Sequence, residues 1–263
     1  MVGVALSIEP AVFRRFEYKY RVRSEIVGDL EQAILPYVEP DPHCAASDGA
    51  YTVRSIYFDT SDLRFYHEKV DGLRVRKKLR IRTYGQPDAS PECFLEIKRK
   101  LDQTVLKERA QLPLADVESA LNGRDPAETM AGRPFPDRRA LERFRFNVNA
   151  LGLRPSVLVT YERRAFVARF GSSVRVNFDG HLRSVLGPGL DAIYQEAGLR
   201  PFETGWICEL KFDERPPKWL MRTVSEFQLR RDPYSKYCHG IEGWAASGER
   251  LSLAHAGALP SGS

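Results

Sequence analysis

Apolar and polar residues alternate along eight stretches of the chain with the period of two that a β-strand produces. These stretches are rich in Val, Ile, Phe and Tyr, which favour strands. The predicted strands cover residues 13–23, 51–59, 73–84, 92–101, 104–112, 156–169, 173–184 and 206–213. The segment FGSS at 170–173 separates two of them and predicts a hairpin turn.

Helical periodicity lies between the strands. Residues 24–36 carry apolar residues at helical spacing, with Ser24 as the expected cap and Pro36 at the end. Further helical or turn segments are predicted at 60–69, 114–122, 137–151, 216–227 and 233–247. Antiparallel strands with helices outside them fit a barrel-like α+β fold. No linker is evident, so we expect one domain over residues 1–250 and a disordered tail over 251–263.

One strand face is unusually basic. The run LRVRKKLRIR at 73–82 places Arg74, Arg76, Lys78, Arg80 and Arg82 on one side, opposite apolar residues. Four more predicted strands show a charged face opposite an apolar face. Either the charges are solvated outside an apolar core, or the charged faces point inward and line a pore. Repetition over five strands favours the pore.

Composition supports an ordinary globular protein with locally concentrated charge. The 263 residues are 43% hydrophobic and 29% charged, with 40 basic and 35 acidic residues. The four cysteines lie far apart in the sequence, which favours reduced, buried thiols in a cytoplasmic protein. No apolar run approaches the roughly 20 residues of a membrane span. If the protein acts at a membrane, a partner must bring it there.

The charged faces indicate a class of chemistry. Arginine is suited to bidentate recognition of phosphate, and the glutamates among the basic residues suit a divalent metal. Together they predict a phosphoryl-transfer site. The motifs GxxxxGK[ST] and GxGxxG are absent from the sequence, which excludes the common nucleotide-binding loops.

An ordered set of short motifs resembles a known family. The motifs are RFEYKY, SIYFDT, KLRIRTYG, FLEIKRK, LKERAQL, YERRAF, VRVNFDG, CELKF and YSKYCHG, from about residue 13 to 240. The chain resembles the catalytic domain of the vacuolar transporter chaperone (VTC) polyphosphate polymerases, within the triphosphate tunnel metalloenzymes. The resemblance implies an eight-stranded antiparallel β-barrel tunnel with helices packed outside. It also implies transfer of the γ-phosphoryl group of ATP to polyphosphate with a divalent metal, Mn²⁺ or alternatively Mg²⁺.

The resemblance and the face pattern together nominate the site residues. Catalytic basic positions are Lys19, Arg80, Arg82, Lys98, Arg163 and Arg175. Further substrate-binding positions are Lys107, Arg109, Lys211 and Lys236. Glu209 matches the family's metal-binding carboxylate, with Glu17 and Glu96 as auxiliary ligands or as partners that orient lysines.

Several alternatives remain open at this level. Arg164 competes with Arg163, because a one-residue slip exchanges the two faces of a strand. Asp179 is expected to cap a turn at 179–180 rather than to hold metal, and Tyr57 is expected to lie under the outer helices. The related triphosphatases carry ExExK on the first strand, where this chain has Arg15, Glu17 and Lys19. Fewer carboxylates favour the polymerase branch.

Three rival functions follow from the same residues. A triphosphatase would use water as the acceptor, and a non-catalytic module would only bind polyphosphate. Nucleic-acid binding is disfavoured, because the aromatic residues mostly alternate to the face opposite the charges. The expected partners are therefore ATP and polyphosphate, with a separate membrane protein for any recruitment to the inner face of a membrane.

Overall fold

The computed structural model describes residues 15–101, 104–123, 128, 130, 132–170 and 173–245. Its strands are β1 (Arg15–Val22), β2 (Val38–Pro40), β3 (Tyr51–Asp59), β4 (Val75–Tyr84), β5 (Glu92–Leu101), β6 (Thr104–Pro113), β7 (Arg154–Ala168), β8 (Arg175–Leu186), β9 (Arg200–Pro201) and β10 (Trp206–Asp213). Its helices are α1 (Ser24–Ile34), α2 (Pro42–Ala45), α3 (Arg64–Val70), α4 (Val117–Asn122), α6 (Phe135–Leu151), α7 (Lys218–Glu226) and α8 (Lys236–Ala245), with 3₁₀ turns η1 (Leu114–Asp116) and η2 (Asp191–Tyr194).

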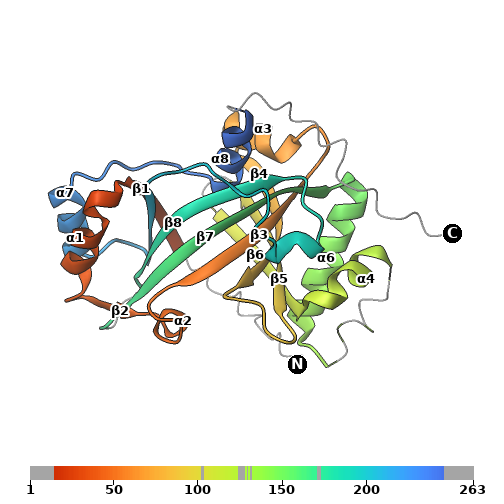
Figure 1. Ribbon diagram of the computed structural model, residues 1–263, viewed down its shortest axis with the longest axis horizontal. Helices are drawn as coiled ribbons and strands as arrows, with labels where there is room; N and C mark the ends of the chain where they lie inside the picture. The colour runs from red at the N-terminus through yellow and green to blue at the C-terminus, as the bar shows by residue number, and fades with distance from the viewer. Residues whose placement is uncertain are drawn as a thin grey trace, which may run out of the picture.

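All eight predicted strands are present and belong to one antiparallel sheet (Figure 1). The main order is β1-β10-β8-β7-β3-β4-β5-β6, with the short strands β2 on β7 and β9 on β8. The expected α+β class, a large antiparallel sheet with helices, is therefore confirmed. The sheet has ten strands rather than eight. Within the described residues β1 and β6 do not pair, so the hydrogen-bonded sheet is open between these two strands.

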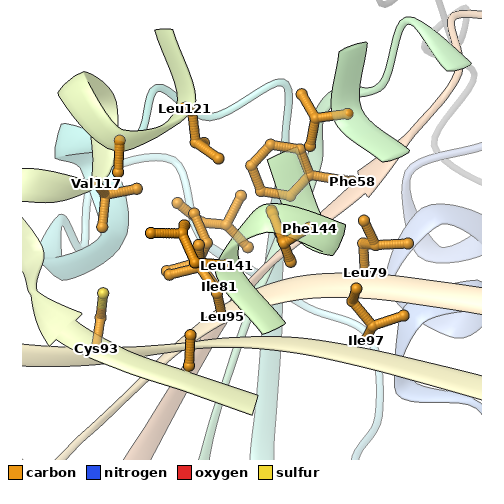
Figure 2. Packing of buried hydrophobic residues seen from close by; sticks show 14 of the residues in the cluster. Phe58, Leu79, Ile81, Cys93, Leu95, Ile97, Val117, Leu121, Leu141 and Phe144 are labelled. Atoms are coloured by element: carbon orange, nitrogen blue, oxygen red, sulfur yellow. The ribbon is translucent and has the colours of Figure 1, made fainter. Parts of the chain in front are cut away.

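The apolar strand faces pack under helices. Leu79, Ile81 and Leu95 lie fully buried against Leu141 and Phe144 of α6 (Figure 2). A second cluster packs α1 and α7 on β1, β8 and β10. Because side chains alternate along a strand, Arg80 and Arg82 are directed away from the helix that covers Leu79 and Ile81. The charged faces thus lie opposite the helix-covered faces.

The sheet curves so that strands far apart in its order approach each other. The carboxylate of Glu17 on β1 raises the pKa of Lys98 on β5, and the ammonium group of Lys211 on β10 lowers it. Charges affect one another's pKa in this way only when they lie close together in a partly desolvated space. The concave face therefore brings the charged side chains of both ends of the sheet together.

The structure corrects the predicted positions of two residues. A register shift lies between Tyr57 and Phe58, and Tyr57 points to the concave face, where its hydroxyl accepts a hydrogen bond from Arg80. The predicted turn at 179–180 is wrong, because β8 continues through both residues and Asp179 is fully buried. Gly180 is required there, since a Cβ would lie 2.5 Å from the ring of Trp206.

Smaller predictions have mixed outcomes. Arg23, not Ser24, is the N-cap of α1, and the Ser24 hydroxyl donates to the carbonyl of Thr204 instead. The four cysteines are free and buried, as expected. The predicted turn at 170–173 and the predicted tail fall partly or wholly outside the described residues. None of the described helices has the length and apolar character needed to cross a bilayer.

Candidate functional site

The concave face gathers charged side chains from seven strands and from α8. Its basic side chains are Lys19, Lys78, Arg80, Arg82, Lys98, Lys107, Arg109, Arg163, Lys211 and Lys236. Its carboxylates are Glu17, Glu96, Asp179 and Glu209. Cations outnumber carboxylates, so the described part of this face carries a net positive charge. We divide it into a Glu209 cluster (Glu17, Lys19, Arg163, Asp179, Glu209, Lys211, Lys236) and a Glu96 cluster (Arg80, Glu96, Lys107, Arg109).

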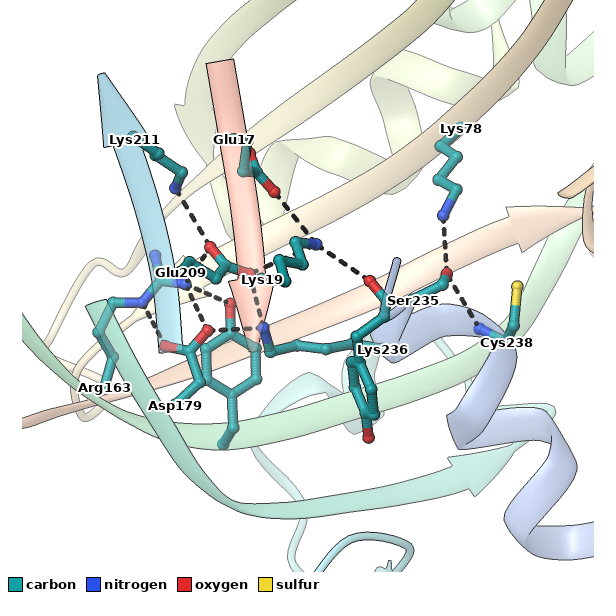
Figure 3. A network of polar contacts seen from close by, with 12 residues as sticks. Glu17, Lys19, Lys78, Arg163, Asp179, Glu209, Lys211, Ser235, Lys236 and Cys238 are labelled. Carbon is teal, nitrogen blue, oxygen red and sulfur yellow. Dashed lines mark hydrogen bonds and ion pairs between the residues drawn. The ribbon is translucent and has the colours of Figure 1, made fainter. Parts of the chain in front are cut away.

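Lys236 is the centre of the Glu209 cluster (Figure 3). Its side chain comes from the first turn of α8, and the residue is only 6% exposed. The ammonium nitrogen lies 2.6 Å from Asp179 Oδ2 and 2.8 Å from Glu209 Oε1. Lys19 lies 3.5 Å from the same glutamate oxygen and 3.1 Å from Glu17. Strands β1, β8 and β10 and helix α8 are therefore joined by one charged network.

Arg163 completes this network from β7. Its guanidinium donates to both oxygens of Asp179, at 2.7 and 2.8 Å, which is the bidentate geometry that suits arginine. Arg164 has the opposite orientation: it stacks on Trp206 at 4.0 Å and pairs with Glu31 at 2.7 Å. Of the two competing arginines, Arg163 is the one on the concave face.

The carboxylates of the Glu209 cluster are ionised at neutral pH. Burial alone would raise the pKa of Glu17, but the ammonium of Lys19 outweighs it and the pKa is about 2. Burial opposes ionisation of Glu209 as well, and Lys236, Lys19 and Lys211 together hold its pKa well below the usual range. Each negative charge in the cluster is thus matched by neighbouring cations.

Glu96 organises the second cluster. It is fully buried, and its two oxygens lie 2.5 Å from Arg80, 2.6 Å from Lys107 and 2.8 Å from Arg109. Burial raises its pKa, but the surrounding cations lower it far more. The contacts of Glu96 therefore favour the role of a partner that orients cations over that of an auxiliary metal ligand.

Arg82 is joined to the Glu209 cluster through a neutral hydroxyl group. Its guanidinium donates to the hydroxyl of Ser55 at 2.9 Å and to that of Tyr161 at 3.2 Å. Tyr161 also accepts from Arg163 at 3.3 Å. Arg82 is 6% exposed, and neutral hydroxyls hold its guanidinium without cancelling its charge.

Two lysines of this face, Lys78 and Lys98, have lowered pKa values. Burial lowers the pKa of Lys78 to about 8. Burial and the nearby charge of Arg80 hold the pKa of Lys98 well below the usual range. Neither lysine forms an ion pair with a carboxylate of the described residues. Both lysines therefore favour binding of an anion, which would stabilise their charged forms.

The outlying candidates lie at the edges of this face. Lys211 is 3.3 Å from Glu209, and the side chain of Lys107 is 41% exposed. Arg175 is exposed at the start of β8, opposite Lys211 in the strand pairing, and belongs to neither cluster. All thirteen nominated residues thus lie on this side of the sheet, and Arg175 is at its exposed edge, apart from the two clusters and the residues between them.

Four residues of this face were not nominated as site residues from the sequence. The sequence analysis placed Lys78 on the basic face with Arg80 and Arg82 but did not nominate it. Tyr161 precedes Arg163 at the same spacing of two residues. Tyr57 and Asp179 were assigned to an outer core and a turn, although alternation with the buried Phe58 and Phe178 places both on the concave face.

The nominated carboxylates do not form a dense metal site by themselves. Within the described residues no group of three or more His, Cys, Asp or Glu side chains is placed to hold a metal ion. Asp179 and Glu209 share the ammonium of Lys236, and Glu17 and Glu209 form a second pair that shares the ammonium of Lys19. This pair fits an ion that takes most of its oxygen ligands from a bound phosphate group.

Comparison with solved structures finds only distant likenesses. The PH1819 protein of Pyrococcus horikoshii OT3 has a TM-score of 0.46 and 14% identity, with 87% of this chain and 98% of that chain covered. A Hippeastrum protein described as having a dominant triphosphatase activity has a TM-score of 0.42 and 16% identity, with 91% and 98% covered. These values add nothing to the assignment of a function.

Comparison with protein families gives a direct result. The family model described as the VTC domain matches residues 14–245. Vacuolar transporter chaperone complex subunit 4 of Schizosaccharomyces pombe is 28% identical over 273 residues, covering 87% of this chain and 37% of that protein. Subunit 4 of Trypanosoma cruzi is 24% identical, covering 88% and 34%. The chain thus spans about a third of the length of these relatives, and it belongs to the VTC domain family.

Proposed function

We propose that this domain transfers the γ-phosphoryl group of ATP to the end of a growing polyphosphate chain held on its concave face. The observation that carries the proposal is the pair Lys78 and Lys98, whose charged forms are disfavoured until an anion binds. A polyphosphate supplies closely spaced negative charges at each step along the face. Membership of the VTC domain family and relatives that are subunits of a VTC complex support the same conclusion.

The concave face would enclose this chain as a tunnel. Its charges come from both ends of the strand order, and Glu17 on β1 lies within electrostatic reach of Lys98 on β5. Bound polyphosphate would contact both ends of the curved sheet and neutralise their mutual repulsion. We infer that the eight long strands act as a tunnel wall even though β1 and β6 are not hydrogen-bonded to each other.

Phosphoryl transfer requires the protein to position the reacting groups and to stabilise their negative charge. Arg80, Arg82 and Lys98 lie on the neighbouring strands β4 and β5, where they would hold successive phosphates of the nucleotide. Lys107, Arg109 and Lys211 would guide the polymer, and Arg175 would meet it at the rim. The terminal phosphate of the polymer is already an anionic nucleophile, so no general base is needed for elongation.

The Glu209 cluster would hold the metal and the reacting end. Arg163, Lys19 and Lys236 fix the positions of the cluster's carboxylates and offer charge to the transferring group. A divalent ion, Mn²⁺ in our expectation, would be held by Glu209 and Glu17 and would neutralise charge on the triphosphate oxygens. Lys19, whose ammonium group contacts both glutamates, would offer its charge to the bound phosphates.

One observation favours a second candidate. Each carboxylate of the described concave face is already neutralised by cations, and none belongs to a three-carboxylate cluster. A module that binds polyphosphate without turnover would need only the cations of this face and no metal-binding cluster of carboxylates. A triphosphatase, in which water replaces the polymer end, shares the same face and differs only in its product.

Product analysis separates these functions. Purified protein is incubated with ATP and Mn²⁺, and the products are sized on a gel beside Glu209→Gln and the exposed control Glu226→Gln. Chains of increasing length that disappear only in Glu209→Gln would support the polymerase. Free phosphate alone would establish a triphosphatase. Salt-dependent polyphosphate binding with neither product would establish the binding module.

The family relationship also suggests a partner. The relatives are subunits of a complex, and this chain matches only about a third of their length. We propose that a separate membrane protein is a partner of this domain. Co-purification of the full chain from membranes of its host, with and without detergent, would test for such a partner.

A further inference from the structure

The hydroxyl of Ser235 lies beside the amine of Lys78. Lys78 Nζ is 2.9 Å from Ser235 Oγ, and Ser235 is 7% exposed (Figure 3). The same oxygen accepts a weaker hydrogen bond from the backbone N–H of Cys238, at 3.4 Å. A nucleophilic oxygen and a potential base are therefore in direct contact on the face that gathers the phosphate-binding cations.

The surroundings of this oxygen suit a phosphate group. Lys19 donates to the carbonyl of Tyr234, the preceding residue, at 3.2 Å, so a second ammonium group lies nearby. Ser235 immediately precedes the ten-residue helix α8, whose N-terminal amides favour negative charge. A phosphate placed on Ser235 would meet two lysines and these amides.

Lys78 has the protonation behaviour of a base. Burial is the main reason that its pKa falls to about 8, and the charges of Lys19 and Lys69 lower it further. Cys238 on α8 and Tyr57 on β3 oppose this effect only in part. A substantial fraction of Lys78 is therefore neutral slightly above neutral pH and able to accept the proton of a serine.

We propose that Ser235 accepts the γ-phosphoryl group of the bound nucleoside triphosphate and becomes the covalent starting end of the polyphosphate chain. Ser235 Oγ forms a bond to the γ-phosphorus, and the bond between that phosphorus and the β,γ-bridging oxygen breaks. ADP leaves with the electron pair of that bond. The hydroxyl proton passes to neutral Lys78 and then to solvent. This inference rests on the proposed function, since it requires a triphosphate on the same face.

The proposal explains how a first chain could begin. Elongation needs a terminal phosphate as the acceptor, and a free enzyme has none of its own. Phosphorylated Ser235 would supply it at a fixed place between Lys78 and Lys19. A hydroxyl is a weaker nucleophile than a phosphate oxygen, which is why the first transfer needs Lys78 although later transfers need no base.

Mass spectrometry tests the proposal on the full chain. Protein freed of bound phosphate is incubated with γ-labelled ATP and Mn²⁺, and its peptides are analysed over time. We expect one acid-stable phosphoryl group on Ser235 before long chains accumulate. Ser235→Ala and Ser235→Asn should both lose it, and the asparagine variant keeps a capping side chain for α8. Ser225→Ala, an exposed serine on α7, should keep it.

The pH profile tests the role of Lys78. The initial rate of Ser235 phosphorylation should rise with pH through a midpoint at or above about 8, because bound triphosphate raises the pKa of this lysine. Lys78→Met should lower the rate at least tenfold and remove the rise. An unchanged profile in Lys78→Met would overturn the assignment of the base.

The outcomes distinguish this proposal from the proposed function. Polyphosphate made by a wild-type protein that never carries phosphate on Ser235 would overturn the proposal and leave the polymerase intact. Acid-labile label on a lysine or histidine would also overturn it. Phosphoserine at position 235 without chain growth would support it while contradicting the polymerase. Failure to bind ATP at all would contradict both.

Discussion

Two lysines of the same face show how neighbours decide the state of a charge. Lys236 lies between Asp179 and Glu209, and although burial opposes its charge, the two carboxylates raise its pKa. Burial lowers the pKa of Lys98, and Arg80, its strongest charged neighbour, lowers it further. Lys236 therefore stabilises the folded protein in its charged form, whereas Lys98 opposes folding until an anion arrives.

Replacement of Lys98 should separate stability from binding. Lys98→Met keeps the aliphatic stem and removes a desolvated charge, so the free energy of unfolding at pH 7 should rise by about 0.5–2 kcal/mol. Affinity for tripolyphosphate should fall at least tenfold. Urea unfolding and calorimetric titration measure the two effects, with the exposed Lys218→Met as the matched control. A variant that loses stability and keeps its affinity would contradict this account of Lys98.

At the scale of elements, α8 determines where Ser235 and Lys236 lie. The helix approaches the sheet closely because two of its residues are glycines. A Cβ on Gly240 would lie 3.1 Å from Val159, and a Cβ on Gly243 would lie 2.7 Å from Phe202. The sequence of α8 therefore fixes the height of its first turn above the concave face.

Two helical glycines give a matched pair of variants. Gly243→Ala should destabilise the protein by about 1–3 kcal/mol because Phe202 must move. It should also weaken ATP binding by shifting the first turn of α8. Gly28→Ala on α1 has open space around the new methyl group and should stabilise by about 0.5–1 kcal/mol. Thermal unfolding and ATP titration of both variants check this, and equal effects would refute the close-packing argument.

The elements also show what the sequence could and could not predict. Long strands were predictable because one face of each is apolar and covered by helices. The short β2, β9 and α2 have too few residues for a detectable period. Tyr57 was misplaced because an aromatic residue was assigned to the core under the helices, and Asp179 because an Asp-Gly pair is typical of a turn. Alternation with Phe58 and with Phe178 already places both side chains on the concave face.

For the whole molecule, carboxylates paired with cations connect the strands across the concave face. Glu17, Glu96, Asp179 and Glu209 all have lowered pKa values because cations surround them, although burial opposes ionisation. A lowered pKa contributes stability that is fully present above the pKa of the unfolded chain, about 4. That contribution is lost as pH falls through the folded value, which is about 2 for Glu17.

Acid unfolding should reflect these carboxylates. The free energy of unfolding should be nearly constant from about pH 7 to 5 and should fall steeply between about pH 4 and 2. Glu96→Gln should reduce the free energy of unfolding by about 3–5 kcal/mol at pH 7, because three cations lose their buried partner. The variant should also show a smaller decrease in this free energy as the pH falls. Urea titrations over this pH range measure both effects. If the free energy of unfolding of the wild type and of Glu96→Gln decreased with the same slope against pH, this origin of the acid sensitivity would be contradicted.

The central claim is that the concave face is a polyanion site with cations held ready for phosphate. The most direct test is calorimetric titration with ATP, without metal, near pH 8 in buffers of different ionisation enthalpy. We predict binding with net proton uptake, because ATP restores the protons of Lys78 and Lys98. The uptake should vanish in the Lys78→Met, Lys98→Met double variant. No binding, or binding with no uptake, would contradict the account.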